Sequence, residues 1–99
     1  LTSVNIPESV EEIGTESFFR CSRLISITIP SKVESLGGDT FGDCVSLSNV
    51  IIRGTIKHLD SKAFSNCTAL THIEYRNIIY NNFEVFKEAV FNQNNQNNQ

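Results

Sequence analysis

Three cysteines are the residues with the clearest capacity for chemistry, and they lie 23 residues apart. Zinc sites use cysteines that are close in sequence, as in Cys-x-x-Cys, and this spacing provides no such pair. Equivalent positions on stacked repeats would lie close enough for a disulfide, but an odd number leaves one thiol unpaired. A free cysteine packs as a small apolar residue. We therefore predict a reduced structural ladder, with a disulfide as the alternative, from Cys21, Cys44 and Cys67.

His58, Asp60 and Ser61 are close enough in sequence to suggest a nucleophilic triad. A triad requires a buried, oriented geometry and an oxyanion hole, and nothing else in the sequence supports one. We interpret these three residues as surface residues, and Glu11 and Glu12 as solvated charges. The sequence therefore predicts no catalytic residues and a protein that is not an enzyme.

Two further motifs could bind or carry other groups. Gly37-Gly38 lacks the Lys-Ser/Thr of a phosphate-binding loop, so we interpret it as a turn. Asn66-Cys67-Thr68 matches the N-glycosylation acceptor, but we expect Cys67 to be buried and favour a chance match. We predict no cofactor and no metal site.

The charge and the hydropathy of the chain limit the kinds of partner that we expect it to bind. A net charge of -3 without a clustered basic face gives no reason to expect a nucleic-acid partner. No apolar run approaches the roughly 20 residues that cross a bilayer, so we predict no membrane insertion in this segment. The chain opens in mid-pattern at Leu1, without Met or a signal peptide, so we expect a piece of a longer protein.

An internal repeat of 23 residues organises the whole chain. Leu occurs at positions 1, 24, 47 and 70, and six further apolar positions recur in the same register without an insertion. Small residues precede the repeated Phe by one position. Such a period is the sequence signature of a solenoid. The repeated aromatic residues, which we predict to form part of the structural ladder, are Phe18, Phe41 and Phe64.

Each unit contains two extended segments and one compact segment. The β-branched start predicts a short strand, Pro7 and Pro30 end it, and Val-x-x-Ile is a second extended segment. Gly14 and Gly37 permit the following turn, and the Phe-x-x-Cys spacing places both side chains on one face of a helical turn. The apolar burial within a lone unit cannot compensate for the conformational entropy that the unit loses when it becomes ordered. Successive coils must therefore stack with parallel strands. We predict an α/β repeat fold, a right-handed β-solenoid.

The second copy, LISITIPSKVESLGGDTFGDC, resembles the BspA-type leucine-rich repeat. The resemblance covers residues 1–75, and it implies a leucine-rich-repeat β-solenoid without catalytic or cofactor residues. Its members are typically surface-exposed or secreted repeat proteins of bacteria and protists, linked to adhesion. The third copy departs from the pattern with Arg53 in place of Pro and Asp60 in place of Gly.

The pattern fades in the fourth copy. Phe83, Phe86 and Val90 have helical spacing, so we predict a capping helix over the last coil, followed by a disordered Asn/Gln tail. We expect Leu1, Val4 and Ile6 to lie on an open face, covered by preceding repeats, by self-association, or by both. The predicted domain is 1–91, with repeats 1–23, 24–46 and 47–69, a partial repeat 70–81, the helix 82–91 and the tail 92–99.

The outward residues of the first strand of each coil are the candidate binding face, because stacked strands offer a continuous surface. Ile25 and Ile51 are apolar where the neighbouring copies are mostly polar, which suits an interface, although neutral drift of surface residues is the alternative. The predicted protein-binding residues are Ile25, Ser26, Thr28, Asn49, Ile51, His72 and Glu74.

These observations favour a non-catalytic protein-binding repeat module, within a larger cell-surface or secreted adhesion-type protein that binds a protein or extracellular-matrix ligand. An intracellular interaction scaffold in the cytoplasm is the alternative, since neither interpretation needs disulfides.

Overall fold

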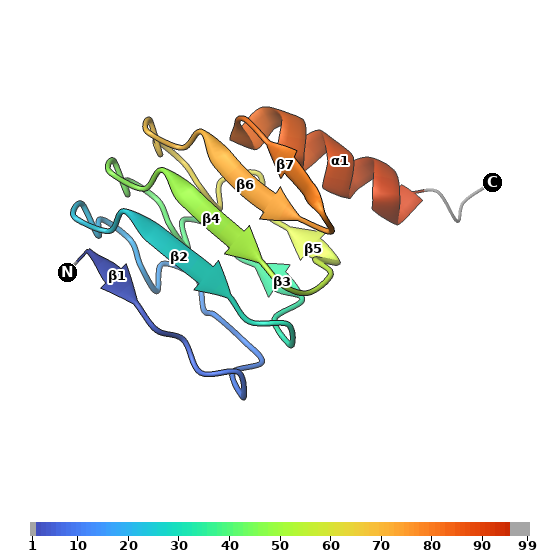
Figure 1. Ribbon diagram of the computed structural model, residues 1–99, viewed down its shortest axis with the longest axis horizontal. Helices are drawn as coiled ribbons and strands as arrows, with labels where there is room; N and C mark the ends of the chain where they lie inside the picture. Colours follow the sequence, from blue (N-terminus) through green and yellow to red (C-terminus); the bar gives the residue numbers. More distant parts are fainter. Residues whose placement is uncertain (1, 96–99) are drawn as a thin grey trace.

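The computed structural model describes residues 2–95 of the chain. It is a β-solenoid of about three turns, in which each coil of about 23 residues repeats the path of the one before (Figure 1). The main sheet has the order β1-β2-β4-β6-β7, and a smaller sheet pairs β3 with β5. The elements are β1 (Ser3–Val4), β2 (Ser26–Ile29), β3 (Ser35–Leu36), β4 (Asn49–Ile52), β5 (His58–Leu59), β6 (His72–Tyr75), β7 (Ile78–Tyr80) and α1 (Phe83–Asn95).

The main sheet is parallel from β1 to β6, and its register follows the sequence repeat. Ile27 pairs with Val50, and Val50 pairs with Ile73. These three side chains are buried, and residues on either side of each are more exposed. This alternation is expected of a strand with one face on a core and one face toward solvent.

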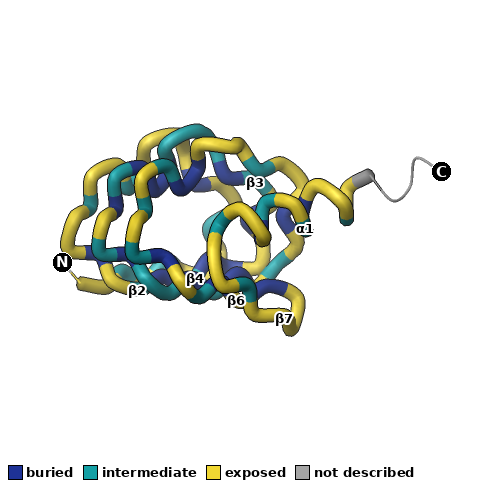
Figure 2. Tube along the Cα trace, turned by 90° about the horizontal axis from the view of Figure 1, so that it is seen from above, coloured by how far each residue is buried: buried dark blue, intermediate teal, exposed yellow. Residues whose placement is uncertain are grey.

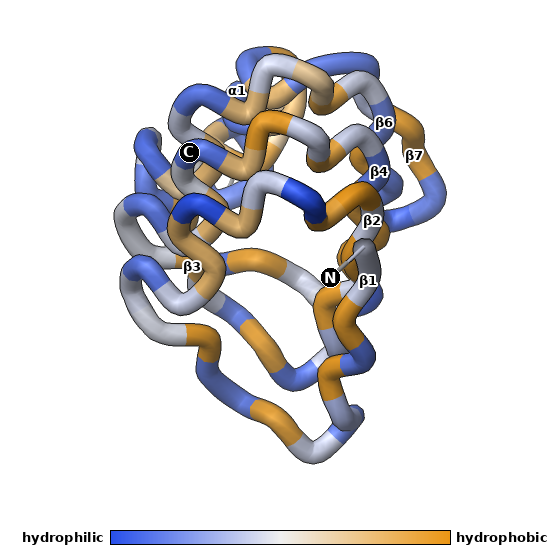
Figure 3. The backbone as a smooth tube through the Cα atoms, turned by 90° about the vertical axis from the view of Figure 1, so that its left-hand side faces the viewer, coloured by the Kyte–Doolittle hydropathy of each residue, from blue (hydrophilic) through white to orange (hydrophobic). Residues whose placement is uncertain are grey.

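The second extended segment of each coil lies on the opposite side of the stack. β3 and β5 pair in parallel, and Ile13 of the first coil forms a bridge to Leu36. Figure 3 views the stack from the N-terminal coil, with β1, β2, β4 and β6 on one side and β3 on the other. The side chains of Val33 and Ile56 project between the two sheets and are fully buried.

The compact segment of each coil is a run of turns, and the predicted helical turn is not found there. Every second N–H of this segment bonds to the next coil: Phe18 N–H donates to Thr40 C=O, and Phe41 N–H donates to Ala63 C=O, both at 2.8 Å. The N–H groups between them, such as that of Phe19, bond within their own coil in single turns. Glu16 and Arg20 adopt φ values of 62° and 63°, which an α-helix excludes. Bonding between coils therefore replaces bonding within a helix.

The predicted role of the glycines in this turn is also corrected. No described glycine has a positive φ; polar residues such as Asp39 and Asp43 take the left-handed conformation. A Cβ at Gly37 would lie 2.7 Å from Thr15 Oγ1 of the preceding coil, so the Thr15 hydroxyl would have to move to make room for it.

The fourth coil turns back on itself in a hairpin that the repeat pattern did not predict. β7 pairs antiparallel with β6, and the two residues between them, Arg76 and Asn77, have φ values of 51° and 68°. Two successive positive φ angles define the tight hairpin turn that matches the twist of the strands. In the sequence, Asn77 followed by Ile78-Ile79-Tyr80 was the signal that could have indicated this hairpin.

Helix α1 closes the C-terminal end of the stack (Figures 1 and 2). Phe86 and Val90 are buried, and Phe86 packs edge-on against Tyr75 and Tyr80 at centroid distances of 5.3 and 5.8 Å. The helix extends to residue 95, four residues beyond the predicted end, so residues 92–95 belong to α1 rather than to a disordered tail. The remaining residues of that predicted tail, 96–99, lie outside the described residues.

The first coil packs against the stack on one side, and Val10 and Phe18 are half-buried where the equivalent Val33 and Phe41 are fully buried. Leu1, which we expected on this face, lies outside the described residues.

Candidate protein-binding face

The candidate binding residues lie in two rows across the outer surface of the main sheet, which we call the strand face. One row joins Ser26, Asn49 and His72, and the next joins Thr28, Ile51 and Glu74. Ile25 lies immediately before β2. The parallel register brings residues 23 positions apart side by side, so short segments of several coils form one surface.

The strand face combines apolar and hydrogen-bonding groups. Ile25 is 48% exposed and Glu74 is exposed, and the other residues of the two rows are half-buried. The Asn49 side-chain oxygen is buried and accepts no hydrogen bond from the described residues. An unsatisfied buried acceptor costs roughly 1–3 kcal/mol, which a donor could recover.

The three repeated phenylalanines form a column inside the turns. Phe18 and Phe41 stack at a centroid distance of 5.2 Å, and Phe41 and Phe64 stack at 5.1 Å, with interplanar angles of 6° and 8°. Phe83 of α1 continues the column at 5.3 Å from Phe64, tilted by 50°. The helix thus supplies the aromatic ring that the fourth coil lacks.

The cysteines lie beside this column as free thiols. Cys44 Sγ donates to the Phe18 carbonyl and Cys67 Sγ donates to the Phe41 carbonyl, both at 3.0 Å. Burial raises the pKa of the Cys44 thiol and raises the pKa of Cys67 to about 12. Because the thiolate is the nucleophile, these two thiols are unreactive at neutral pH.

The residues weighed as a triad are exposed, and Asp60 Oδ1 accepts the backbone N–H of Lys62 at 2.8 Å. Glu11 and Glu12 are also exposed. Asn66, the candidate glycosylation site, is exposed, and its Nδ2 donates to Asp43 Oδ1 at 3.1 Å.

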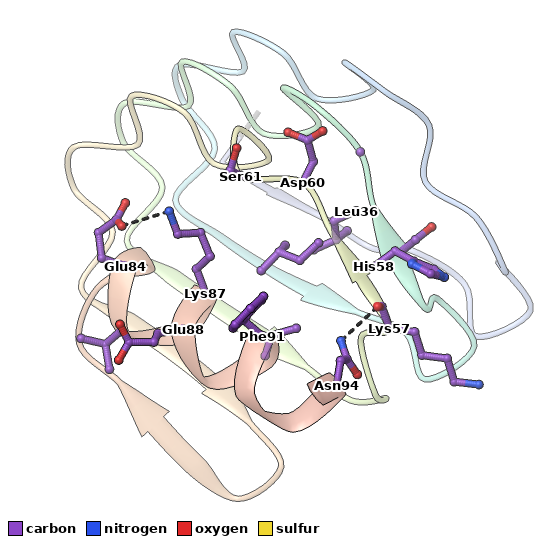
Figure 4. A pocket seen from close by; sticks show the side chains of 15 residues that line it. Leu36, Lys57, His58, Asp60, Ser61, Glu84, Lys87, Glu88, Phe91 and Asn94 are labelled. Atoms are coloured by element: carbon purple, nitrogen blue, oxygen red, sulfur yellow. Dashed lines mark hydrogen bonds and ion pairs between the residues drawn. The ribbon is translucent and has the colours of Figure 1, made fainter. Parts of the chain in front are cut away.

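A second surface feature was not predicted: a groove of about 1080 Å³ between β5 and α1. Figure 4 shows Phe91 extending from α1 into this space, opposite Leu36 and His58. The sequence indicated the helix but not the strand that it faces, because residues 57 and 94 are related by no pattern. Charged residues line the groove at Lys57, Asp60, Glu84, Lys87 and Glu88.

Across residues 2–95, no group of three or more His, Cys, Asp or Glu side chains is placed to hold a metal ion. None of the helices in the described part of the chain has the length and apolarity needed to span a membrane.

A family profile described as "BspA type Leucine rich repeat region (6 copies)" matches residues 1–98. The chain belongs to this family. The repeat that defines the BspA-type sequence is thus the one that sets the register of the sheet and the spacing of the Phe column.

The BspA-type chain is also similar to a solved structure, the crystal structure of a leucine rich cell surface protein from Faecalibacterium prausnitzii A2-165. The two share 29% sequence identity and superpose with a TM-score of 0.71. The alignment covers 86% of this chain and 21% of that chain. None of the curated proteins compared with this chain matches it.

Proposed function

We propose that this chain is a non-catalytic protein-binding module that recognises its partner through the strand face. The observation that supports the proposal is the continuous parallel sheet, which places Ile51 between Thr28 and Glu74, with the exposed Ile25 immediately before β2. Exposed apolar side chains surrounded by hydrogen-bonding groups are typical of interfaces. The crossovers that join the strands are right-handed in this proposal, as nearly all parallel β connections are.

We further propose that the module belongs to a larger cell-surface or secreted protein and binds a protein or extracellular-matrix ligand. Membership of the BspA-type family and the similarity to a leucine rich cell surface protein support this setting. The strand face has room for a ligand that spans several coils, since each row crosses β2, β4 and β6.

An intracellular scaffold is the second candidate, and the free thiols favour it. Cys21, Cys44 and Cys67 are all unpaired, as expected in a reducing compartment. A signal peptide in the full-length reading frame would decide for the surface protein, and a fused intracellular domain would decide for the scaffold.

Binding to a panel of immobilised extracellular-matrix proteins, measured by biolayer interferometry, tests the strand face. Replacing both Ile25 and Ile51 with Glu should weaken binding by at least about tenfold, equivalent to about 1.4 kcal/mol, with an unchanged circular dichroism spectrum. Val45→Glu is the matched control, because Val45 is an exposed aliphatic residue (42%) outside the strand face.

Loss of binding in the Val45 variant but not in the double variant would contradict the proposed face. Absence of binding to every member of the panel would contradict the extracellular-matrix assignment.

A further inference from the structure

The outer edge of β5 has backbone N–H and C=O groups that form no hydrogen bond with another strand. His58 N–H donates to Glu34 C=O at 3.2 Å, and Asp60 N–H donates to Leu36 C=O at 2.9 Å. Successive residues of a strand direct their N–H and C=O groups to opposite sides, so those of Leu59 point away from β3. Among residues 2–95, none bonds to the Leu59 N–H or C=O.

Part of the same edge is already bonded to α1. Asn94 Nδ2 donates to Lys57 C=O at 3.0 Å (Figure 4). Gln93 Nε2 donates to Ile56 C=O at 3.2 Å. Lys57 lies immediately before β5, where the strand alternation does not yet hold: its N–H donates to Glu34 C=O at 2.7 Å, while its C=O accepts from α1. The edge thus carries a hydrogen-bonded part at Ile56 and Lys57 and an unpaired part at Leu59, which lines the groove.

The side of the groove formed by α1 has apolar residues among its charged ones. Val85 is 52% exposed and lines the groove, and the buried Leu36 and Val90 lie at its base. Alternate side chains of an added strand point to one side, so aliphatic residues at every second position could contact these groups.

The charges of the groove favour a basic partner. Its lining has the carboxylates of Asp60, Glu84 and Glu88. Both lysines of the lining have carboxylate partners, Lys87 with Glu84 at 3.1 Å and Lys57 with Glu34 at 3.5 Å. Asp60 and Glu88 form no ion pair with a described cation. Complementary charge steers a partner to a site and selects against the wrong sign.

We propose that the groove between β5 and α1 binds an extended segment of a partner protein, with alternating aliphatic and basic side chains, that adds to the edge of β5 at Leu59. Main-chain hydrogen bonds hold the segment, and the side-chain pattern selects it, as in other cases of strand addition. This site is separate from the strand face and does not depend on it.

The probe is a fluorescent, end-capped peptide, Val-Lys-Val-Thr-Val-Lys-Val, titrated with the full chain and followed by anisotropy. We expect saturable binding, and in the ¹⁵N NMR spectrum slower hydrogen exchange at the Leu59 amide when the peptide is present. Val85→Lys should weaken binding by at least about tenfold, because it places a cation where the peptide brings one. Ile78→Lys is the matched control: Ile78 has a similar exposure (53%) and lies outside the groove.

A second peptide, N-methylated at every amide, keeps the charge and the side chains but has no N–H left to donate to a strand on either edge. Its loss of binding supports strand addition, whereas equal binding reduces the interaction to charge and overturns the proposal. The proposal is equally overturned if the wild-type chain does not bind the first peptide, or if Val85→Lys and Ile78→Lys weaken binding alike. Binding that is lost with Ile51→Lys and kept with Val85→Lys would place the peptide on the strand face instead.

Discussion

At the scale of single residues, Gly54 shows how closely successive coils approach. A Cβ at this position would overlap the carbonyl oxygen of Ser31 in the preceding coil. That neighbour is backbone, so it cannot move aside as a flexible side chain would. The requirement for glycine here comes from the space between coils.

Gly54→Ala should therefore destabilise the protein by about 2 kcal/mol, toward the upper part of the usual range of roughly 0.5–3 kcal/mol for single substitutions. Gly14→Ala is the control, because its Cβ would meet only the Ser17 hydroxyl, at 3.3 Å. Urea unfolding followed by circular dichroism measures both, and equal stability of the two variants would contradict the close approach.

The thiol of Cys67 makes stability depend on alkaline pH. Its pKa rises from 9.0 to about 12 in the folded chain, chiefly through burial. Between these values the unfolded chain releases the proton and the folded chain keeps it, so the free energy of unfolding falls as the pH rises. Below pH 9 both states are protonated and this dependence vanishes.

Cys67→Ala should consequently show a shallower decline of stability between pH 9 and 11 than the wild type, measured by urea titration at each pH. Cys21→Ala, at the equivalent position of the first coil, serves as the comparison. A decline that is equally steep in the Cys67 variant would show that other groups cause it.

At the scale of elements, α1 begins at a cap that the sequence supplies. Asn82 Oδ1 accepts the backbone N–H of Val85 at 2.9 Å, and the Asn82 carbonyl accepts that of Phe86 at 3.3 Å. This is the geometry of a helix N-cap, where Asn is among the preferred residues. The cap places Phe83 on the Phe column and Phe86 on Tyr75.

Asn82→Ala should lower the stability by about 1 kcal/mol, the usual value for a lost N-cap. The neighbouring Asn81 is equally exposed and caps nothing in the described structure, so Asn81→Ala should have a smaller effect. Thermal unfolding of the two variants compares them directly, and a larger loss at Asn81 would refute the assignment of the cap.

The end of α1 is held by side-chain amides. Gln93 accepts a hydrogen bond from Tyr75 at 2.7 Å and one from Arg76 at 2.8 Å, while its Nε2 donates to Ile56 C=O. A segment that looks like low-complexity sequence thus includes residues that bond to the Ile56 and Lys57 carbonyls of the third coil. This bonding supplies a structural reason for the helix to continue past residue 91.

At the scale of the whole molecule, the two ends of the solenoid differ: α1 closes the C-terminal end, whereas the first coil packs against the stack on one side. Helix α1 covers the apolar edge of the last coil, as terminal units of repeat proteins must.

Deleting residues 82–99 exposes Phe64, Tyr75 and the edge of β5, and should lower the melting temperature or cause aggregation. Deleting residues 96–99 alone is the control and should leave the melting temperature unchanged. Calorimetry and light scattering measure the outcome, and an unchanged melting temperature in the longer deletion would refute the capping role.

The 23-residue spacing by itself determined the coil, the parallel register and the residues that share a column, because equivalent positions on stacked coils must lie together. It also indicated the helix, through the change from the repeat to a helical spacing of Phe83, Phe86 and Val90. Local spacing did not reveal that every second N–H group of the turn segment bonds to the next coil, so the predicted helical turn was wrong. Only the tertiary structure decided the hairpin partner of β7, the amide contacts of Gln93 and Asn94, and the groove beside Leu59. These depend on residues up to 37 positions apart that no repeat relates, and their contacts exist only once the coils have stacked.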